Sequence, residues 1–141
     1  MPICEVYFRR GLFAQAEIDK IAERLTDVLL QAEGFENNTI SRSLCFINMM
    51  PCDSMIVGAR ASETGKVVIK IHVFQDAYTD VTKKGLHAEI AKVFAEESEA
   101  CRGQEARNVW SLVLPVADND FAAGGRIATL DATRKLVASA S

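Results

Sequence analysis

Long apolar runs are missing from this sequence of 141 residues, although 49% of its residues are hydrophobic. A helix that crosses a membrane needs about 20 consecutive apolar residues, so the sequence predicts no transmembrane segment and no membrane partner. The first ten residues, MPICEVYFRR, contain three charged residues and no apolar stretch of the kind found in signal peptides. We therefore expect a cytoplasmic protein.

Cysteine and histidine are scarce, with four and two copies respectively. The four cysteines are Cys4, Cys45, Cys52 and Cys101. They are far apart and form no C-x-x-C pair, which argues against a zinc site. A chain of this length buries enough surface to fold without a disulfide or a metal ion. We expect free, largely buried thiols, no metal and no other cofactor.

An excess of positive charge is also absent, because 16 lysines and arginines stand against 19 acidic residues. The basic residues are scattered rather than gathered into a stripe, so the sequence predicts no nucleic-acid partner. The overall composition is typical of one globular domain, and we expect a single domain over residues 1–141.

Strand and helix patterns alternate along the chain. The expected strands cover residues 3–8, 44–49, 67–74 and 109–114, and the expected helices cover 14–33 and 80–99. Gly34 is expected to end the first helix and Thr79 to begin the second. Pro51 and Pro115 are expected to close the strands that precede them.

The connecting segments are expected to be less regular. Residues 35–40 and 101–108 are predicted to form polar loops, and residues 55–59 another extended stretch. A tight turn is expected at 62–65, with Gly65 able to take a positive φ angle. The tail, 116–141, is predicted to be a glycine-containing loop followed by a short helix.

The order strand, helix, strand occurs twice, which indicates an internal repeat over approximately 2–51 and 67–115. Two βαβ units can join into one mixed sheet with both helices on one face, an α+β fold. The other face of such a sheet has no cover. Because its strands are apolar on both faces, we expect this face to be buried by oligomerisation.

Pro2 is the residue with the clearest chemical potential. A methionine before a residue as small as proline is ordinarily removed, which would leave a free secondary amine. An α-amino group has a pKa of about 7.7–8.0, and burial or a nearby cation lowers it. Such a nitrogen is a suitable general base for removing a proton from carbon beside a carbonyl group.

Three segments carry a resemblance to a known family: MPICEVYF, VVIKIHVFQDAYTDVTKK and VWSLVLPVADNDFAAGGRI. Together with the double βαβ pattern, they resemble the tautomerase superfamily, and most closely its long fused members. That superfamily includes 4-oxalocrotonate tautomerase, cis-3-chloroacrylic acid dehalogenase and malonate semialdehyde decarboxylase. The resemblance implies a cofactor-independent homotrimer with Pro2 as its catalytic residue.

The resemblance also implies where substrate would bind. Gln75 and Tyr78 stand where the dehalogenase and decarboxylase carry two arginines, and both could bind substrate oxygens. Arg126 matches an arginine near the site of such relatives and could hold a carboxylate; the alternative is a solvated loop residue. Arg60 is a weaker candidate of the same kind, and Trp110 could form a pocket wall or belong to the core or an interface.

Other catalytic groups of the dehalogenase have no counterpart. Leu29, Leu112 and Ala123 stand where that enzyme has a histidine, a tyrosine and a glutamate, so water activation has no evident agent. The sequence thus favours a tautomerase acting on a small 2-oxo acid. A hydratase, decarboxylase or dehalogenase of a small unsaturated or 3-oxo acid is one alternative, and a non-catalytic trimeric binding protein is another.

Overall fold

A computed structural model describes residues 2–140, without the side chains of residues 104 and 105. Met1, whose removal we expect, lies outside the described residues. The strands are β1 (Ile3–Arg9), β2 (Phe46–Cys52), β3 (Ile56–Val57), β4 (Arg60–Ala61), β5 (Val67–Phe74), β6 (Val109–Val116), β7 (Ala122–Ala123) and β8 (Arg126–Ile127). The α-helices are α1 (Gln15–Glu33), α2 (Thr39–Ser43), α3 (Asp80–Glu97), α4 (Glu99–Arg102) and α5 (Leu130–Ala138).

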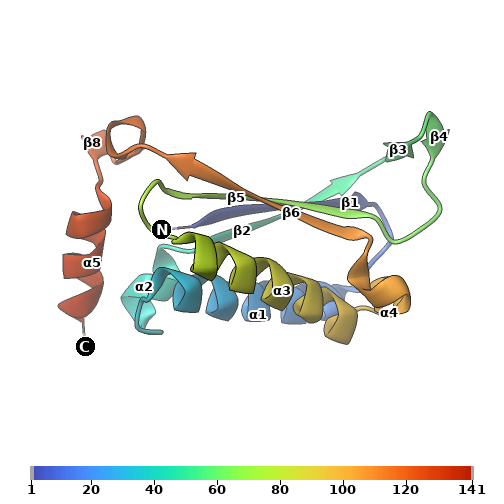
Figure 1. Cartoon of the computed structure of the whole chain (residues 1–141), viewed down its shortest axis with the longest axis horizontal. Coiled ribbons are helices and arrows are strands. Elements are labelled where there is room, and N and C mark those ends of the chain that lie inside the picture. Colours follow the sequence, from blue (N-terminus) through green and yellow to red (C-terminus); the bar gives the residue numbers. More distant parts are fainter. Residues whose placement is uncertain (1, 141) are drawn as a thin grey trace.

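The main sheet has four strands in the order β2-β1-β5-β6. β1 runs parallel to β2 and antiparallel to β5, and β5 runs parallel to β6. The chain therefore contains two βαβ units, β1-α1-β2 and β5-α3-β6, whose strands form one mixed sheet. Figure 1 shows α1 and α3 side by side against the same face of that sheet. The expected α+β architecture is confirmed.

Local sequence signals account for the two long helices. Gly34 ends α1 in the left-handed conformation, and its N–H donates to the carbonyls of Leu30 and Gln31. Thr79 caps α3, where its side chain accepts a hydrogen bond from the Thr82 N–H at 3.1 Å. No helix in the described part of the chain has both the length and the hydropathy needed to cross a membrane.

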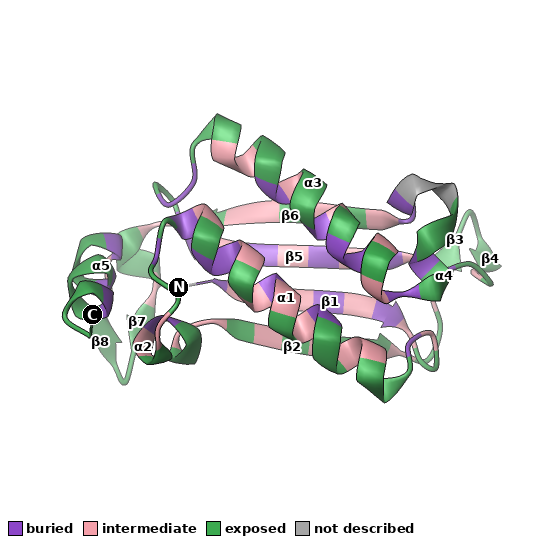
Figure 2. Cartoon of the chain, turned by 90° about the horizontal axis from the view of Figure 1, so that it is seen from below, coloured by how far each residue is buried: buried purple, intermediate pink, exposed green. Residues whose placement is uncertain are grey.

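The core lies between the sheet and the two long helices. Burial alternates along β1, so that Cys4, Val6 and Phe8 face the helices while Glu5 and Tyr7 face the opposite side. The same alternation is visible along β5 in Figure 2. Burial of each large apolar side chain contributes roughly 1.5–3 kcal/mol, which fixes the register of these two central strands.

The prediction that Pro51 and Pro115 end their strands was wrong, because these residues lie inside β2 and β6. These two strands are the outer strands of the sheet. A proline lacks the N–H that a central strand needs for its second ladder, but an outer strand bonds to only one neighbour.

Two connecting segments also differ from expectation. α2 forms where a polar loop was expected to continue, and the Asn38 side chain caps it by accepting from the Ser41 N–H at 2.9 Å. α4 occupies part of the expected loop at 101–108. A short helix is difficult to predict because it contains too few turns for a periodic pattern.

Gly65 does not adopt a positive φ; the nearest residues that do are Gly58 and Ala59, between β3 and β4. Gly65 instead allows a close approach of two backbone segments. A Cβ atom at this position would lie 2.5 Å from the carbonyl oxygen of Ala100. A residue without a side chain is therefore required at position 65, so that this turn can pack against the segment that contains α4.

Candidate active site at the start of the first strand

Pro2 is buried at the start of β1, at the end of the sheet where the chain begins. Its carbonyl oxygen accepts a hydrogen bond from the Phe46 N–H at 3.0 Å. Continuing the strand register by one residue places Pro2 beside Cys45 and Val73. By the alternation of β1, Pro2 lies on the same face as Cys4, the face that the helices cover.

Tyr78 lies at the same end of the sheet, just before α3. Its ring is buried, and its hydroxyl donates to the Leu29 carbonyl of α1 at 3.4 Å. Burial raises the pKa of Tyr78, and the nearby Glu33, Cys45 and Cys4 act in the same direction. Tyr78 is therefore a neutral hydrogen-bonding group within an enclosed polar region.

Two thiols border this region and remain protonated. Burial raises the pKa of Cys4 to about 12 and that of Cys45 to about 11. A thiol is nucleophilic only as its thiolate, so neither cysteine is suited to covalent catalysis. They form a weakly polar wall beside Pro2 instead.

Glu33 is a member of this region that sequence reasoning missed. It is the last residue of α1, and only 3% of its surface is exposed. Burial raises the pKa of its carboxyl group. Its spacing of four residues from Leu29, a core residue, is the signal that could have shown that Glu33 faces inward.

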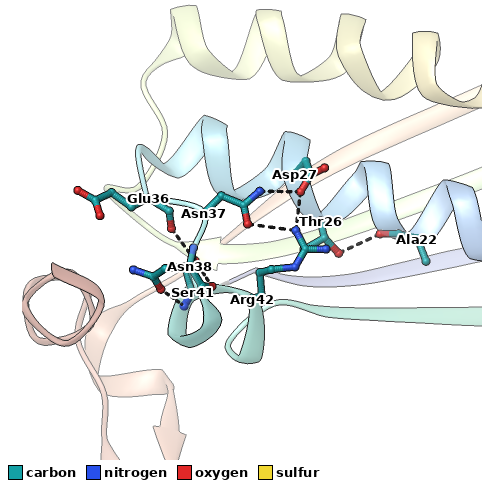
Figure 3. A network of polar contacts seen from close by, with 8 residues as sticks. All are labelled: Ala22, Thr26, Asp27, Glu36, Asn37, Asn38, Ser41 and Arg42. Atoms are coloured by element: carbon teal, nitrogen blue, oxygen red, sulfur yellow. Dashed lines mark hydrogen bonds and ion pairs between the residues drawn. The ribbon is translucent and has the colours of Figure 1, made fainter. Parts of the chain in front are cut away.

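A polar network holds the segment that leads to Cys45. Figure 3 shows Asp27, Asn37 and Arg42 joined, with Asp27 Oδ1 2.8 Å from Asn37 Nδ2 and 2.6 Å from Arg42 Nη1. The buried Ser41 hydroxyl donates to the Glu36 carbonyl at 2.6 Å. These contacts tie α2 to α1 and so position the entry into β2 next to Pro2.

Gln75 and Arg126, two of the predicted substrate contacts, belong to this end of the molecule. Gln75 directly follows β5, has an exposed side chain, and donates its backbone N–H to the Val116 carbonyl at 2.9 Å. Arg126 lies on the exposed β7–β8 hairpin, which projects beyond the same end of the sheet (Figure 1). Both side chains are accessible to a small molecule.

Arg60 and Trp110 lie at the opposite end. Arg60 is on β4, in the hairpin that Figure 1 shows at the end away from the N-terminus. Trp110 lies near the start of β6, is 64% exposed, and donates its indole N–H to the Arg107 carbonyl at 3.1 Å. A single chain therefore does not bring these two residues to Pro2.

The sheet face opposite the helices has a polar centre. The Tyr7 hydroxyl donates to Glu5 Oε2 at 3.2 Å, and His72 Nε2 lies 3.6 Å from the same oxygen. The Lys70 ammonium lies 5.2 Å from the centroid of the Tyr7 ring. Exposed apolar residues of the two outer strands flank this centre: Phe46, Met50, Trp110 and Leu112.

Comparison with known proteins identifies the fold. The sequence has no significant match to a protein-family model or to a curated protein. The structure, however, is similar to that of the F6 fused 4-OT asymmetric trimer, with a TM-score of 0.73 at 20% identity over 89% of this chain and 94% of that chain. This chain has the tautomerase fold.

Two further structures with the tautomerase fold are similar to this chain. N1, a member of the cis-3-chloroacrylic acid dehalogenase family, has a TM-score of 0.72 at 20% identity over 88% of this chain and 81% of that chain. Pt0534, whose structure was solved after inactivation by 2-oxo-3-pentynoate, has a TM-score of 0.72 at 13% identity over 89% of this chain and 94% of that chain.

Proposed function

We propose that this protein is a cofactor-independent tautomerase that interconverts the enol and keto forms of a small 2-oxo acid. The observation that carries the proposal is the position of Pro2, which is buried immediately before the first strand of a tautomerase fold, beside an enclosed polar region. After removal of Met1, Pro2 would present a rigid secondary amine at that point.

The reaction needs only a proton shuttle. The unprotonated nitrogen of Pro2 accepts the proton of the enol hydroxyl, which leaves an enolate and a protonated proline. The same proton then moves to the substrate carbon and restores the free amine. No atom is gained or lost, and general acid–base catalysis of this kind contributes about 10²–10⁴-fold to a rate.

Three residues at the Pro2 end of the sheet are assigned as substrate contacts. Arg126 would bind the carboxylate through two N–H groups, Gln75 would bind a carbonyl oxygen, and Tyr78 would contribute its neutral hydroxyl. Arg60 and Trp110 can contribute only from a neighbouring copy, because they lie at the far end of their own chain. The site is therefore incomplete in one chain.

A homotrimer would supply that neighbouring copy. The exposed apolar residues on the uncovered face are concentrated on the two outer strands, where adjacent copies would meet. The F6 fused 4-OT is itself described as a trimer. Burial of this apolar rim would provide the driving force for assembly.

A non-catalytic binding protein is the second candidate. Gln75 and Tyr78 are both neutral, and the ring of Tyr78 is buried, so the substrate carboxylate would depend on Arg126 alone. This proposal predicts ligand binding without turnover. It retains the trimer and the proposed ligand contacts but assigns no chemical step to Pro2.

Ketonisation of phenylenolpyruvate, followed for the native protein and for Pro2→Ala, separates these candidates. We expect the Pro2→Ala variant to lose about 10²–10⁴-fold in kcat/KM, the contribution of a general base. Pro51→Ala is the matched control, because it removes an exposed proline from β2 that lies beside Phe8, at the end of β1 away from Pro2. Equal background rates in all three proteins, with Met1 absent by intact mass, would contradict the tautomerase proposal and favour the binding protein.

A further inference from the structure

A buried carboxyl group at the end of α1 has no role in the proton shuttle as described above. Glu33 follows Leu29 by four residues, so its backbone N–H bonds to the same carbonyl that accepts from the Tyr78 hydroxyl. This shared carbonyl brings α1 and the start of α3 together at Glu33. The Tyr78 ring and the side chain of Glu33 are both almost fully enclosed there.

The same region contains Pro2. Cys45 lies beside Pro2 in the strand register, and Cys4 lies two residues further along the same face of β1. Both cysteines interact electrostatically with Tyr78, and Glu33 interacts with Tyr78 and with Cys45. Glu33 thus lies close to Tyr78 and to Cys45, and Cys45 in turn lies beside Pro2.

The titratable groups that face Glu33 come from several elements. The entry to β2 contributes the neutral thiol of Cys45, and the segment before α3 contributes the neutral hydroxyl of Tyr78. α5 contributes the guanidinium of Arg134, which favours the ionised carboxylate, whereas burial favours the neutral acid. A cation that formed inside this enclosure would therefore be stabilised mainly by Glu33.

The proton shuttle creates such a cation each time Pro2 accepts a proton. We propose that Glu33 is a positioning residue whose carboxylate pairs with protonated Pro2 and thereby sets the pH at which Pro2 exchanges protons with substrate. This inference rests on the proposed function of Pro2. An opposite charge within about 4–6 Å favours the charged form of its partner by about 1–3 pKa units.

The pairing predicts the direction in which the pKa of the Pro2 nitrogen shifts. A carboxylate raises the pKa of the proline nitrogen, because it stabilises the protonated amine and has no effect on the neutral one. In Glu33→Gln that stabilisation is lost. The amine of the variant should then be free at a lower pH than the amine of the native protein.

Modification of Pro2 by 2-oxo-3-pentynoate measures this directly and does not depend on turnover. A free secondary amine adds across the alkyne that is conjugated to the ketone. A C–N bond forms, the N–H proton moves to the other alkyne carbon, and the adduct keeps every atom of both reactants. Peptide mapping separates an adduct of the N-terminal residue from any adduct of the cysteines.

The rate of Pro2 modification should be measured against pH for the native protein, Glu33→Gln, Glu33→Asp and Glu23→Gln. We expect Glu33→Gln to lower the half-maximal pH by about one unit or more, and Glu33→Asp to restore part of that shift. Glu23→Gln is the matched control, because Glu23 is an exposed carboxylate on the same helix, and it should leave the profile unchanged.

The outcomes distinguish the two proposals. Pro2 adducts with the same half-maximal pH in the native protein and in folded Glu33→Gln would overturn the role of Glu33 and leave the proposed function intact. No Pro2 adduct in any of the four proteins would overturn both. If Glu33→Gln does not fold, the native protein can be labelled at the proline nitrogen and the glutamate carboxyl carbon and titrated by NMR. A coupled pair shares its titration midpoints, so we expect Pro2 and Glu33 to show the same midpoints. Independent midpoints would overturn the inference.

Discussion

The two faces of the main sheet are built from alternate residues of the same strands, yet they differ completely in chemistry. On β5, Ile69 and Ile71 are fully buried beneath the helices, whereas Lys70 and His72 are partly exposed on the other face. The inner face of the two central strands is apolar. The outer face has a charged centre and an apolar rim on its outer strands.

This difference separates the residues that stabilise the fold of one chain from the residues that are available for assembly and function. The inner face loses nearly all contact with water within one chain, so its contribution to folding is complete without a partner. The rim residues Trp110 and Leu112 remain exposed, so their contribution becomes available only on association. The following changes test that separation in order of expected effect.

Ile71→Ala should have the largest effect because it leaves a cavity in the inner face. We expect the free energy of unfolding to fall by about 2–5 kcal/mol, measured by denaturant titration. Val68→Ala, on the outer face of the same strand, is the matched control and should cost less. Similar losses for the two variants would show that the two faces contribute equally to folding.

Leu112→Asp should act on assembly rather than on folding. Leu112 is 44% exposed in one chain, so the variant should retain its unfolding free energy to within about 0.5 kcal/mol for the dissociated chain. A charge on a rim that the proposed trimer would cover should nevertheless shift the sedimentation of the protein from trimer towards monomer. Leu136→Asp changes an exposed leucine of α5 and is the control, which should leave the mass of the assembly unchanged. Dissociation of both variants, or of neither, would contradict assignment of the rim as the interface.

Tyr7→Phe should have the smallest effect. It removes the hydroxyl that donates to Glu5 in the polar centre but keeps the ring beneath Lys70. We expect a loss of about 0.5–1 kcal/mol, and a double-mutant cycle with Glu5→Gln should give a coupling energy of similar size. A coupling of about 2 kcal/mol or more would indicate that the polar centre is shielded from water in the assembled protein.

The elements that were predicted well are those with strong local signals. α1 and α3 were expected from three-and-four apolar spacing with Gly34 and Thr79 at their ends, and β5 was expected with its observed bounds. The prolines of the outer strands were misjudged because whether a strand is central or outer depends on its neighbours. Gly65 was misjudged because the carbonyl that excludes a side chain there belongs to Ala100, which is distant in sequence.

The candidate site divides in the same way. Pro2 could be selected from its place at the start of a strand, and the nature of its nitrogen is a property of the residue itself. Glu33 was not singled out, because nothing in the neighbouring sequence showed that the Tyr78 hydroxyl would approach the same turn of α1. The separation of Arg60 and Trp110 from Pro2 also required the sheet order.

By itself, the amino-acid sequence determined which segments become the two long helices and the four main strands, which face of each is apolar, and which residue offers an amine for proton transfer. Those properties depend on side chains within a few positions of one another. Only the tertiary structure decided the order of the strands, the enclosure of Glu33 with Tyr78 and Cys45, and the end of the sheet at which each candidate contact lies. Those properties depend on burial and electrostatics between residues that are distant in sequence, and chain packing alone brings them together.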